Sequence, residues 1–165
     1  MRELNGKIAP REQLAALWAA TPPGRVVLAN GLFDLCHVGH ARYLADARAR
    51  GDLLVLALND DASAAQNKGP RRPLQPLAER LLVAAAFRAV DFVTWFPERS
   101  VAATLRLLRP QFHAKGTDYR PATLPADERE AHHELDIEVV IVGDDKAHAT
   151  SDLIATILGG PEDVV

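Results

Sequence analysis

The sequence contains one cysteine, Cys36, among 165 residues, so no disulfide can form within the chain. No apolar run approaches the roughly 18 residues that a membrane-spanning helix requires. The first residues, Met1–Ile8, lack the apolar core of a signal peptide. These absences predict a cytoplasmic protein that does not act at a membrane.

The sequence also lacks a basic excess. Lys and Arg number 19 against 22 Asp and Glu, and the formal net charge is -3 with the histidines neutral. General nucleic-acid binders usually carry an excess of cations that neutralises phosphates. We therefore expect no nucleic-acid partner. A polyanionic ligand would have to be bound by a few local cations and backbone amides.

The length and the 48% hydrophobic content suit one globular domain. Apolar runs that read as buried strands alternate with segments of helical apolar spacing. We expect strands over residues 25–29, 53–58, 92–95, 111–114 and 137–142, and helices over 10–20, 38–50, 76–87, 100–108, 127–134 and 151–158. This alternation predicts a single α/β domain with a parallel sheet of about five strands and helices on both faces. We place it at residues 25–158, after an N-terminal helical extension (1–24) and before a frayed tail (159–165).

Ligands of such sheets bind beyond the carboxyl ends of the strands, near the point where the strand order reverses. The first strand-to-helix turn has the most suggestive composition, Asn30-Gly-Leu-Phe-Asp-Leu-Cys-His-Val-Gly-His40. Gly31 permits a backbone path that a β-carbon would obstruct, and Gly39 allows close approach to the helix start. Free amides there attract phosphate, with a dipole contribution of about 0.3–1 kcal/mol.

His37 and His40 are three residues apart, so in a helix they point to similar sides. Two imidazoles at an anion-binding helix start are suited to donate hydrogen bonds to a phosphoryl group. A metal site is the weaker alternative, because no third ligand lies nearby in the sequence.

These residues, together with motifs further along, resemble the His-x-Gly-His nucleotidyltransferase superfamily, which has a Rossmann-like fold, and its cytidylyltransferase-like branch in particular. Within that branch the similarity is to the adenylyltransferases of heptose-phosphate (ADP-heptose) synthesis, and it covers residues from about 26 to 157. It is carried by Asn30-Gly-Leu-Phe-Asp34, His37-Val-Gly-His40, Asn59-Asp-Asp-Ala-Ser63, Lys68-Gly69, Arg72-Pro73, Arg80 and Lys115-Gly-Thr-Asp-Tyr119.

The resemblance implies that a substrate phosphate attacks the α-phosphorus of a nucleoside triphosphate and that pyrophosphate leaves in line. The attacking group is already an anion, so positioning and cations suffice and no general base is needed. Carried over by motif, the catalytic residues are His37, His40, Lys68 and Lys115. The nucleotide-binding residues are Asn30, Gly31, Phe33, Asp34, Gly39, Arg80, Thr150 and Ser151, and the substrate-binding residues are Arg72, Gly116, Asp118 and Tyr119.

Magnesium is expected with the triphosphate, and Asp34 either holds it through water or orients a histidine. No further metal ligand is assigned. Lys68 lies in a polar segment, residues 66–73, which we expect to be a loop that closes over the triphosphate or is simply solvated. Arg80 either binds the nucleotide or faces solvent. His132 and His133 lie on a polar helix and are expected to be solvated.

The sequence departs from the family pattern at Thr117, where a second glycine is usual, and at Ala149, where a hydroxyl is usual. Thr117 is compatible with the loop if its φ is negative. The departures leave open a nucleotide sensor that does not catalyse, and glycerol-phosphate, choline-phosphate or flavin nucleotidyltransferases remain alternatives within the class. We expect a homo-oligomer, a dimer, as the resemblance to the family implies. We expect no fused kinase domain, so that another protein would supply the phosphorylated acceptor.

Overall fold

The first two strands of the sheet are largely apolar runs buried on both faces. The computed structural model describes residues 6–120, 124–144, 153–154, 157 and 159. The strands are β1 (Val26–Gly31), β2 (Leu53–Asn59), β3 (Phe92–Phe96), β4 (Phe112–Lys115) and β5 (Glu138–Ile141). They pair in parallel in the order β3-β2-β1-β4-β5. The predicted parallel sheet of five strands is confirmed.

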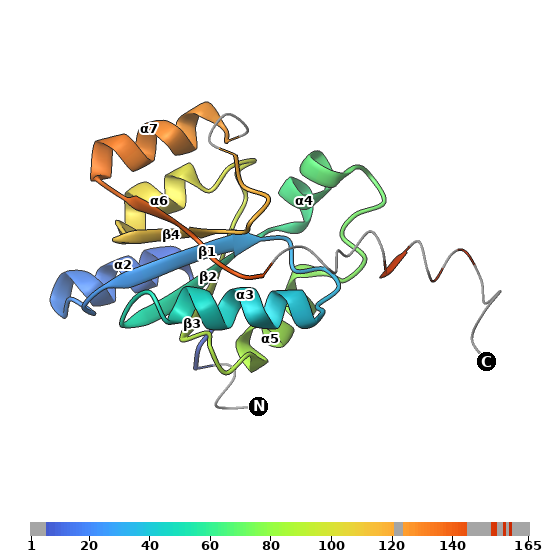
Figure 1. Cartoon of the computed structure of the whole chain (residues 1–165), viewed down its shortest axis with the longest axis horizontal. Helices are drawn as coiled ribbons and strands as arrows, with labels where there is room; N and C mark the ends of the chain where they lie inside the picture. The colour runs from blue at the N-terminus through green and yellow to red at the C-terminus, as the bar shows by residue number, and fades with distance from the viewer. Residues whose placement is uncertain (1–5, 121–123, 145–152, 155–156, 158, 160–165) are drawn as a thin grey trace.

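Helices connect the strands and cover both faces of the sheet. They are α2 (Arg11–Ala20), α3 (Val38–Arg48), α4 (Asp61–Lys68), α5 (Leu77–Ala86), α6 (Ala102–Leu108) and α7 (Ala126–Leu135). Figure 1 shows α3 and α5 on one side of the sheet and α6 and α7 on the other. No helix of the described residues is long and apolar enough to cross a bilayer.

Two apolar clusters hold these layers together. On one face, Leu44 of α3 and Ala84 of α5 pack against β1 and β2. On the other face, Leu105 of α6 packs with Leu14 and Trp18 of α2. The N-terminal helix α2 thus contributes to the core of the domain and packs against α6 and β3.

The strand order reverses between β1 and β4. From β1 the chain proceeds outward through β2 to β3, and it then returns to place β4 on the other side of β1. In parallel sheets, a ligand crevice forms at this reversal, outside the carboxyl ends of the two strands. Asn30 and Gly31 end β1, and Lys115 ends β4, so the fold brings these predicted site residues to one edge.

One helix differs from the sequence expectation. Residues 66–68, predicted to belong to a polar loop, form the last part of α4. Asp60 caps this helix by accepting a hydrogen bond from the Ser63 amide at 2.7 Å. The helix ends at its C-cap Gly69, whose φ is 96°. The expected loop therefore begins at Gly69, and Lys68 is anchored at a helix end. The helix predicted over residues 151–158 lies largely outside the described residues.

Candidate active site

The turn between β1 and α3 carries the two motif histidines. His37 is the N-cap of α3 and His40 lies in its first turn. The imidazole rings of His37 and His40 are 4.0 Å apart between centroids. The backbone N–H of His37 donates to Nδ1 of His40 at 3.3 Å. The structure therefore places both predicted histidines at the positive end of a helix, where backbone amides and the helix dipole favour an anion.

His40 is held in a defined protonation state. Its Nδ1 accepts the His37 amide, so the neutral ring carries its proton on Nε2. Burial, followed by the charge of His37, lowers the pKa of His40 from 6.5 to about 4. At neutral pH the Nε2–H group is thus a neutral donor, and an anionic ligand beside it would favour the protonated form.

The Phe33 ring packs against the His40 ring, with the centroids 4.7 Å apart. Its side chain is 5% exposed and belongs to the core, and its backbone has a φ of 49°. A β-carbon at Gly31 would lie 3.0 Å from the Phe33 ring, which explains the glycine there. Phe33 was predicted to bind nucleotide. The structure places its side chain beneath His40, and a nucleotide contact from its backbone stays a prediction.

Asp34 joins the first turn to the segment after α4. Its carboxylate accepts hydrogen bonds from Arg72 at 2.6 Å and from the backbone amides of Leu74 and Gln75. Burial acts to raise the pKa of Asp34, but these amides and Arg72 outweigh it, and the pKa lies below 3.8. Both oxygens are committed to this segment, so the carboxylate fits the predicted magnesium role poorly. Arg72, predicted to bind substrate, is the partner of Asp34.

Arg80 is the largest fully buried side chain of the described chain. Its guanidinium donates to the carbonyl oxygens of Leu32 at 2.8 Å, Asn59 at 2.9 Å and Gln75 at 3.0 Å. It also pairs with Asp61 at 2.7 Å. The alternative in which Arg80 faces solvent is wrong. The guanidinium ties the carboxyl ends of β1 and β2 to α4 and α5, and any contact with nucleotide stays a prediction.

Lys115 lies at the end of β4, beside Asn30 at the end of β1. Its ammonium donates to Oδ1 of Asn30 at 3.2 Å and to Oε2 of Glu128 at 3.0 Å. Glu128 comes from α7 and is 4% exposed. Sequence analysis missed Glu128, since nothing in its local sequence distinguishes it from the other acidic residues of α7.

A histidine pair adjoins the same group of residues. Nε2 of His113 lies 2.9 Å from Oδ1 of Asn30, and Nδ1 of His113 lies 2.7 Å from Nε2 of His132. His113 is fully buried and His132 half-buried. The expectation that His132 is solvated is wrong, because the ring turns inward from α7. His133, by contrast, is exposed, as predicted.

The segment after β4 is tied to α3. Tyr43 of α3 donates to the carbonyl oxygen of Ala114 at 2.9 Å, and the amide of Tyr119 donates to Gly116 to close a turn. Asp118 of this turn is exposed. Among the described residues, non-glycine positive φ values occur at Phe33, Arg109 and Asp136. Thr117 is not among them. Its φ is therefore compatible with threonine, although the family pattern has glycine at this position.

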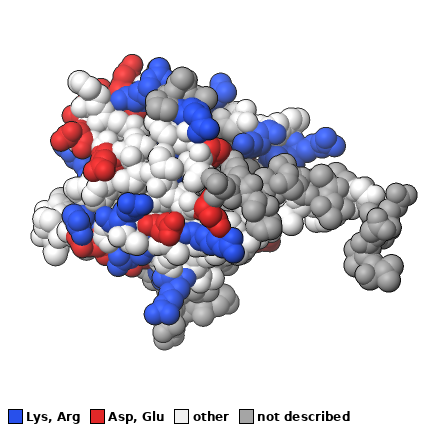
Figure 2. Space-filling view, in the orientation of Figure 1, with Lys and Arg blue, Asp and Glu red and all other residues white. Residues whose placement is uncertain are grey.

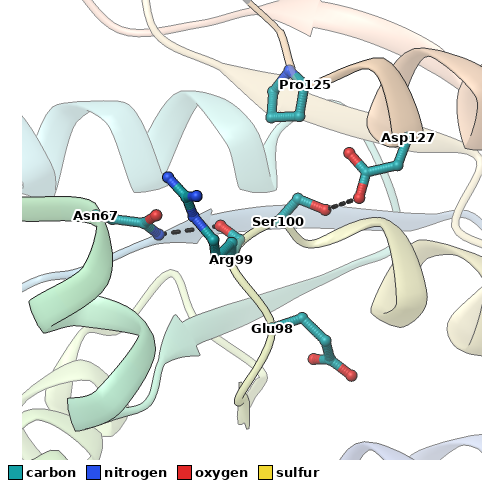
Figure 3. Close-up of a pocket in the computed structure, with 6 residues that line it drawn as sticks. All are labelled: Asn67, Glu98, Arg99, Ser100, Pro125 and Asp127. Carbon is teal, nitrogen blue, oxygen red and sulfur yellow. Dashed lines mark hydrogen bonds between the residues drawn. The ribbon is translucent and has the colours of Figure 1, made fainter.

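Basic side chains gather over the end of α4 (Figure 2), where Lys68 and Arg71 are exposed. Elsewhere on this face acidic and basic side chains are interspersed. A polar pocket of about 300 Å³ lies between α4, the loop after β3 and the start of α7 (Figure 3). It is lined by Asn67, Glu98, Arg99, Ser100, Pro125 and Asp127. Because these segments all follow strand ends, the pocket opens at the same edge of the sheet as the histidines.

Two predicted residues, Thr150 and Ser151, lie outside the described residues, as does His148. Gly39 lies in the first turn of α3, as expected. Within the described ranges, no group of three or more His, Cys, Asp or Glu side chains is placed to hold a metal ion.

Comparison with known proteins assigns this arrangement to a family. The family model described as cytidylyltransferase-like matches residues 28–159, which include the second half of β1, the histidine turn and every later strand of the sheet. The chain belongs to the cytidylyltransferase-like family. It is a nucleotidyltransferase-like domain, and the predicted family membership is confirmed.

Curated relatives carry the name bifunctional protein HldE. The relative from Geotalea uraniireducens is 41% identical over 158 residues, or 94% of this chain and 32% of the relative. The one from Chromohalobacter salexigens is 40% identical over 154 residues, or 93% and 32%. The chain thus spans about a third of the length of these relatives.

A solved structure has a similar fold. The lipopolysaccharide core biosynthesis protein from Thermoplasma volcanium GSS1 matches with a TM-score of 0.62 and 26% identity, over 74% of this chain and 99% of that one. The predicted Rossmann-like α/β fold is thereby confirmed.

Proposed function

We propose that this domain transfers AMP from ATP to a sugar phosphate, a heptose 1-phosphate, and releases pyrophosphate. The observation that carries the proposal is the pair of histidines at the start of α3, with His40 fixed as an Nε2–H donor. Lys115 from the neighbouring strand adds a cation at the same edge. The resemblance to bifunctional HldE proteins and to a lipopolysaccharide core biosynthesis protein supports a sugar phosphate as acceptor.

In the proposed mechanism, an oxygen of the sugar phosphate attacks the α-phosphorus and the pyrophosphate oxygen leaves opposite it. The attacking oxygen is anionic, so the residues contribute position and charge stabilisation. His37 and His40 donate to the phosphoryl oxygens at the amides of α3, Lys115 binds from β4, and Lys68 binds from the end of α4. Magnesium, when bound, neutralises charge on the triphosphate.

The acceptor is proposed to lie beside the strand ends that carry the 116–119 turn. The polar pocket next to α4 supports a ligand rich in hydroxyl groups, because carboxylates, an amide and a guanidinium line it. Asp127 accepts a hydrogen bond from Ser100, and Asn67 donates to the carbonyl oxygen of Arg99 at 3.0 Å (Figure 3). These contacts fix the pocket walls before a ligand enters.

A pyrophosphate-release assay with ATP or CTP, magnesium and a panel of phosphorylated acceptors tests the proposal. We expect turnover with ATP and heptose 1-phosphate that is lost when magnesium is chelated. Turnover with CTP and glycerol phosphate would move the assignment to a cytidylyltransferase. Nucleotide binding without turnover on any acceptor would favour a sensor and contradict the proposed reaction.

The domain is further proposed to act as a homodimer in the cytoplasm. Light scattering after size exclusion gives the mass directly, and a single species of 17.9 kDa would contradict the dimer.

A further inference from the structure

We propose that Glu128, His113 and His132 are positioning residues that fix the Lys115 ammonium and the Asn30 amide at the ligand edge. The inference rests on the proposed function, in which Lys115 binds phosphoryl oxygens. The three residues come from β4 and α7, and none lies in the motifs on which the resemblance to the nucleotidyltransferases rests. They are joined to Asn30 and Lys115 by a continuous chain of hydrogen bonds from His132 to Glu128.

The chemistry of Asn30 sets the direction of the chain. Its Oδ1 lies within bonding distance of both the Lys115 ammonium and Nε2 of His113. An amide oxygen can only accept, so His113 must carry its proton on Nε2. Nδ1 of His113 then accepts, and the partner nitrogen of His132 must donate. The orientation of the Asn30 amide is thereby fixed, with its NH₂ group turned away from His113 and Lys115.

Burial keeps this arrangement in one protonation state. Burial is the largest cause that lowers the pKa of His113 well below 6.5, and the charges of Lys115 and His132 act in the same sense. A proton on Nδ1 of His113 would oppose the donor of His132 and break the chain. His113 therefore stays neutral near neutral pH and links His132 to Asn30 through its two ring nitrogens.

Glu128 holds the ammonium from the opposite side. Its side chain is 5% exposed and that of Lys115 is 15% exposed, so water replaces this pair poorly. The other Glu128 oxygen accepts the Val101 amide, which ties the carboxylate to the start of α6. An ammonium has three donors, and Asn30 and Glu128 take two. The third direction is the one that remains for a phosphoryl oxygen.

This arrangement has an electrostatic consequence. Glu128 offsets much of the positive charge of Lys115. The lysine therefore contributes mainly a directed hydrogen bond to the phosphoryl group, and less a long-range attraction of the triphosphate. Removing Glu128 would leave a mobile cation that attracts triphosphate but no longer meets the reacting phosphorus. We therefore expect loss of Glu128 to lower kcat with little rise in KM.

The test is a double-mutant cycle of Glu128→Ala and Lys115→Ala, with Glu128→Gln as the conservative variant and exposed Glu130→Ala on the same helix as control. Pyrophosphate release gives kcat and KM for the nucleoside triphosphate, and thermal unfolding checks that each variant is folded. We expect E128A to lower kcat roughly 10- to 100-fold, as a misplacement of about 1 Å does. E128Q should recover most of the rate, and E128A should cost nothing further once Lys115 is gone.

Equal losses from E128A with and without Lys115, or an unchanged kcat in folded E128A, would overturn the positioning role. A second measurement does not need turnover: imidazole ¹⁵N shifts of the wild-type chain should show Nε2 protonated and Nδ1 unprotonated on His113 at pH 7.5. A proton on Nδ1 would overturn the inference even in an active enzyme. An inactive wild type with the expected tautomers would instead count against the proposed reaction alone.

Discussion

Phe33 places its ring 4.7 Å, centroid to centroid, from the ring of His40, and it does so from a backbone φ of 49°. A left-handed bulky residue is costly and persists only where its surroundings over-determine it. Here those surroundings are the core below the ring and Gly31 beside it. The strained turn and the desolvated histidine are therefore two parts of one arrangement.

Replacing Phe33 with alanine should raise the pKa of His40 from about 4 toward 6.5, since burial is the main cause of its depression. It should also destabilise the fold by about 3–5 kcal/mol, as large-to-small changes in cores do. An NMR titration of the His40 ring gives the pKa, and denaturant unfolding gives the stability. A His40 pKa that stays near 4 in the folded variant would show that Phe33 does not shield the ring.

Replacing His40 with alanine should lower turnover about 100- to 1000-fold, the range seen when one charge-stabilising donor is removed. Exposed His133→Ala is the matched control and should leave the rate unchanged. His132, which sequence analysis treats as silent, is not a suitable control because it bonds to His113. An H40A enzyme with the wild-type rate would remove His40 from the proposed mechanism.

Replacing Arg80 with leucine should destabilise the fold by about 3–5 kcal/mol, because three backbone carbonyls and Asp61 lose a buried charged partner. Arg80→Lys should recover only part of this, since an ammonium cannot reproduce the fork of donors. Denaturant unfolding measures both. Arg106→Ala, which breaks an exposed pair with Glu134, should cost no more than about 1 kcal/mol. A tolerated R80L would mean that the carbonyls find other donors.

Stability should fall as the pH is lowered from about 6.5 toward 4.5. The pKa values of His40 and His113 are depressed in the folded chain, to about 4 for His40, so over this window the unfolded chain binds protons that the folded chain excludes. Carboxylates with lowered pKa values, such as Asp34, contribute only at lower pH. Melting temperatures across pH 7.5 to 4.5 test this, and His113→Leu should flatten the dependence. A flat wild-type profile would contradict it.

The sequence was sufficient to predict β1 and β2 because each is largely an apolar run with no competing period. It missed α4 because a helix that buries only Ser63 and Ala64 has almost no apolar stripe. Turn chemistry was the available signal there: Asp60 precedes the helix as a cap, and Gly69 ends it.

The burial of Arg80 had a signal in the sequence. Leu77, Leu81, Ala84 and Ala85 form a helical stripe, and Arg80 falls on the same face between them. An arginine on the apolar face of a helix indicates that buried acceptors bind its guanidinium, because that face is turned away from solvent. The partners themselves, the Leu32 and Asn59 carbonyls, are 48 and 21 residues away and carry no side-chain signature.

The contacts of Lys115 could not be predicted from the sequence either, because its partners lie far from it in the chain and Glu128 has no distinguishing sequence pattern. Its position at a strand end agrees with the short strand predicted over residues 111–114, and the resemblance to the family predicts a catalytic role for it. Which side chains surround it depends on how α7 packs, and Glu128 and His132 look like ordinary surface residues of a polar helix. Long-range packing decides between those readings.

The reversal of strand order divides the proposed machinery between two stretches of chain. Residues up to β3 carry the motif histidines His37 and His40, with Arg80 and Asn30. Residues from α6 onward carry Lys115, Glu128, His113 and His132. The hydrogen bonds of Asn30 with Lys115 and His113 join the two stretches of chain. Two fragments cut in the loop after Phe96 would each carry part of the proposed site. A triphosphate that contacts residues of both fragments would stabilise their association. If the domain binds a nucleoside triphosphate as proposed, reassembly of the two fragments should depend on that ligand.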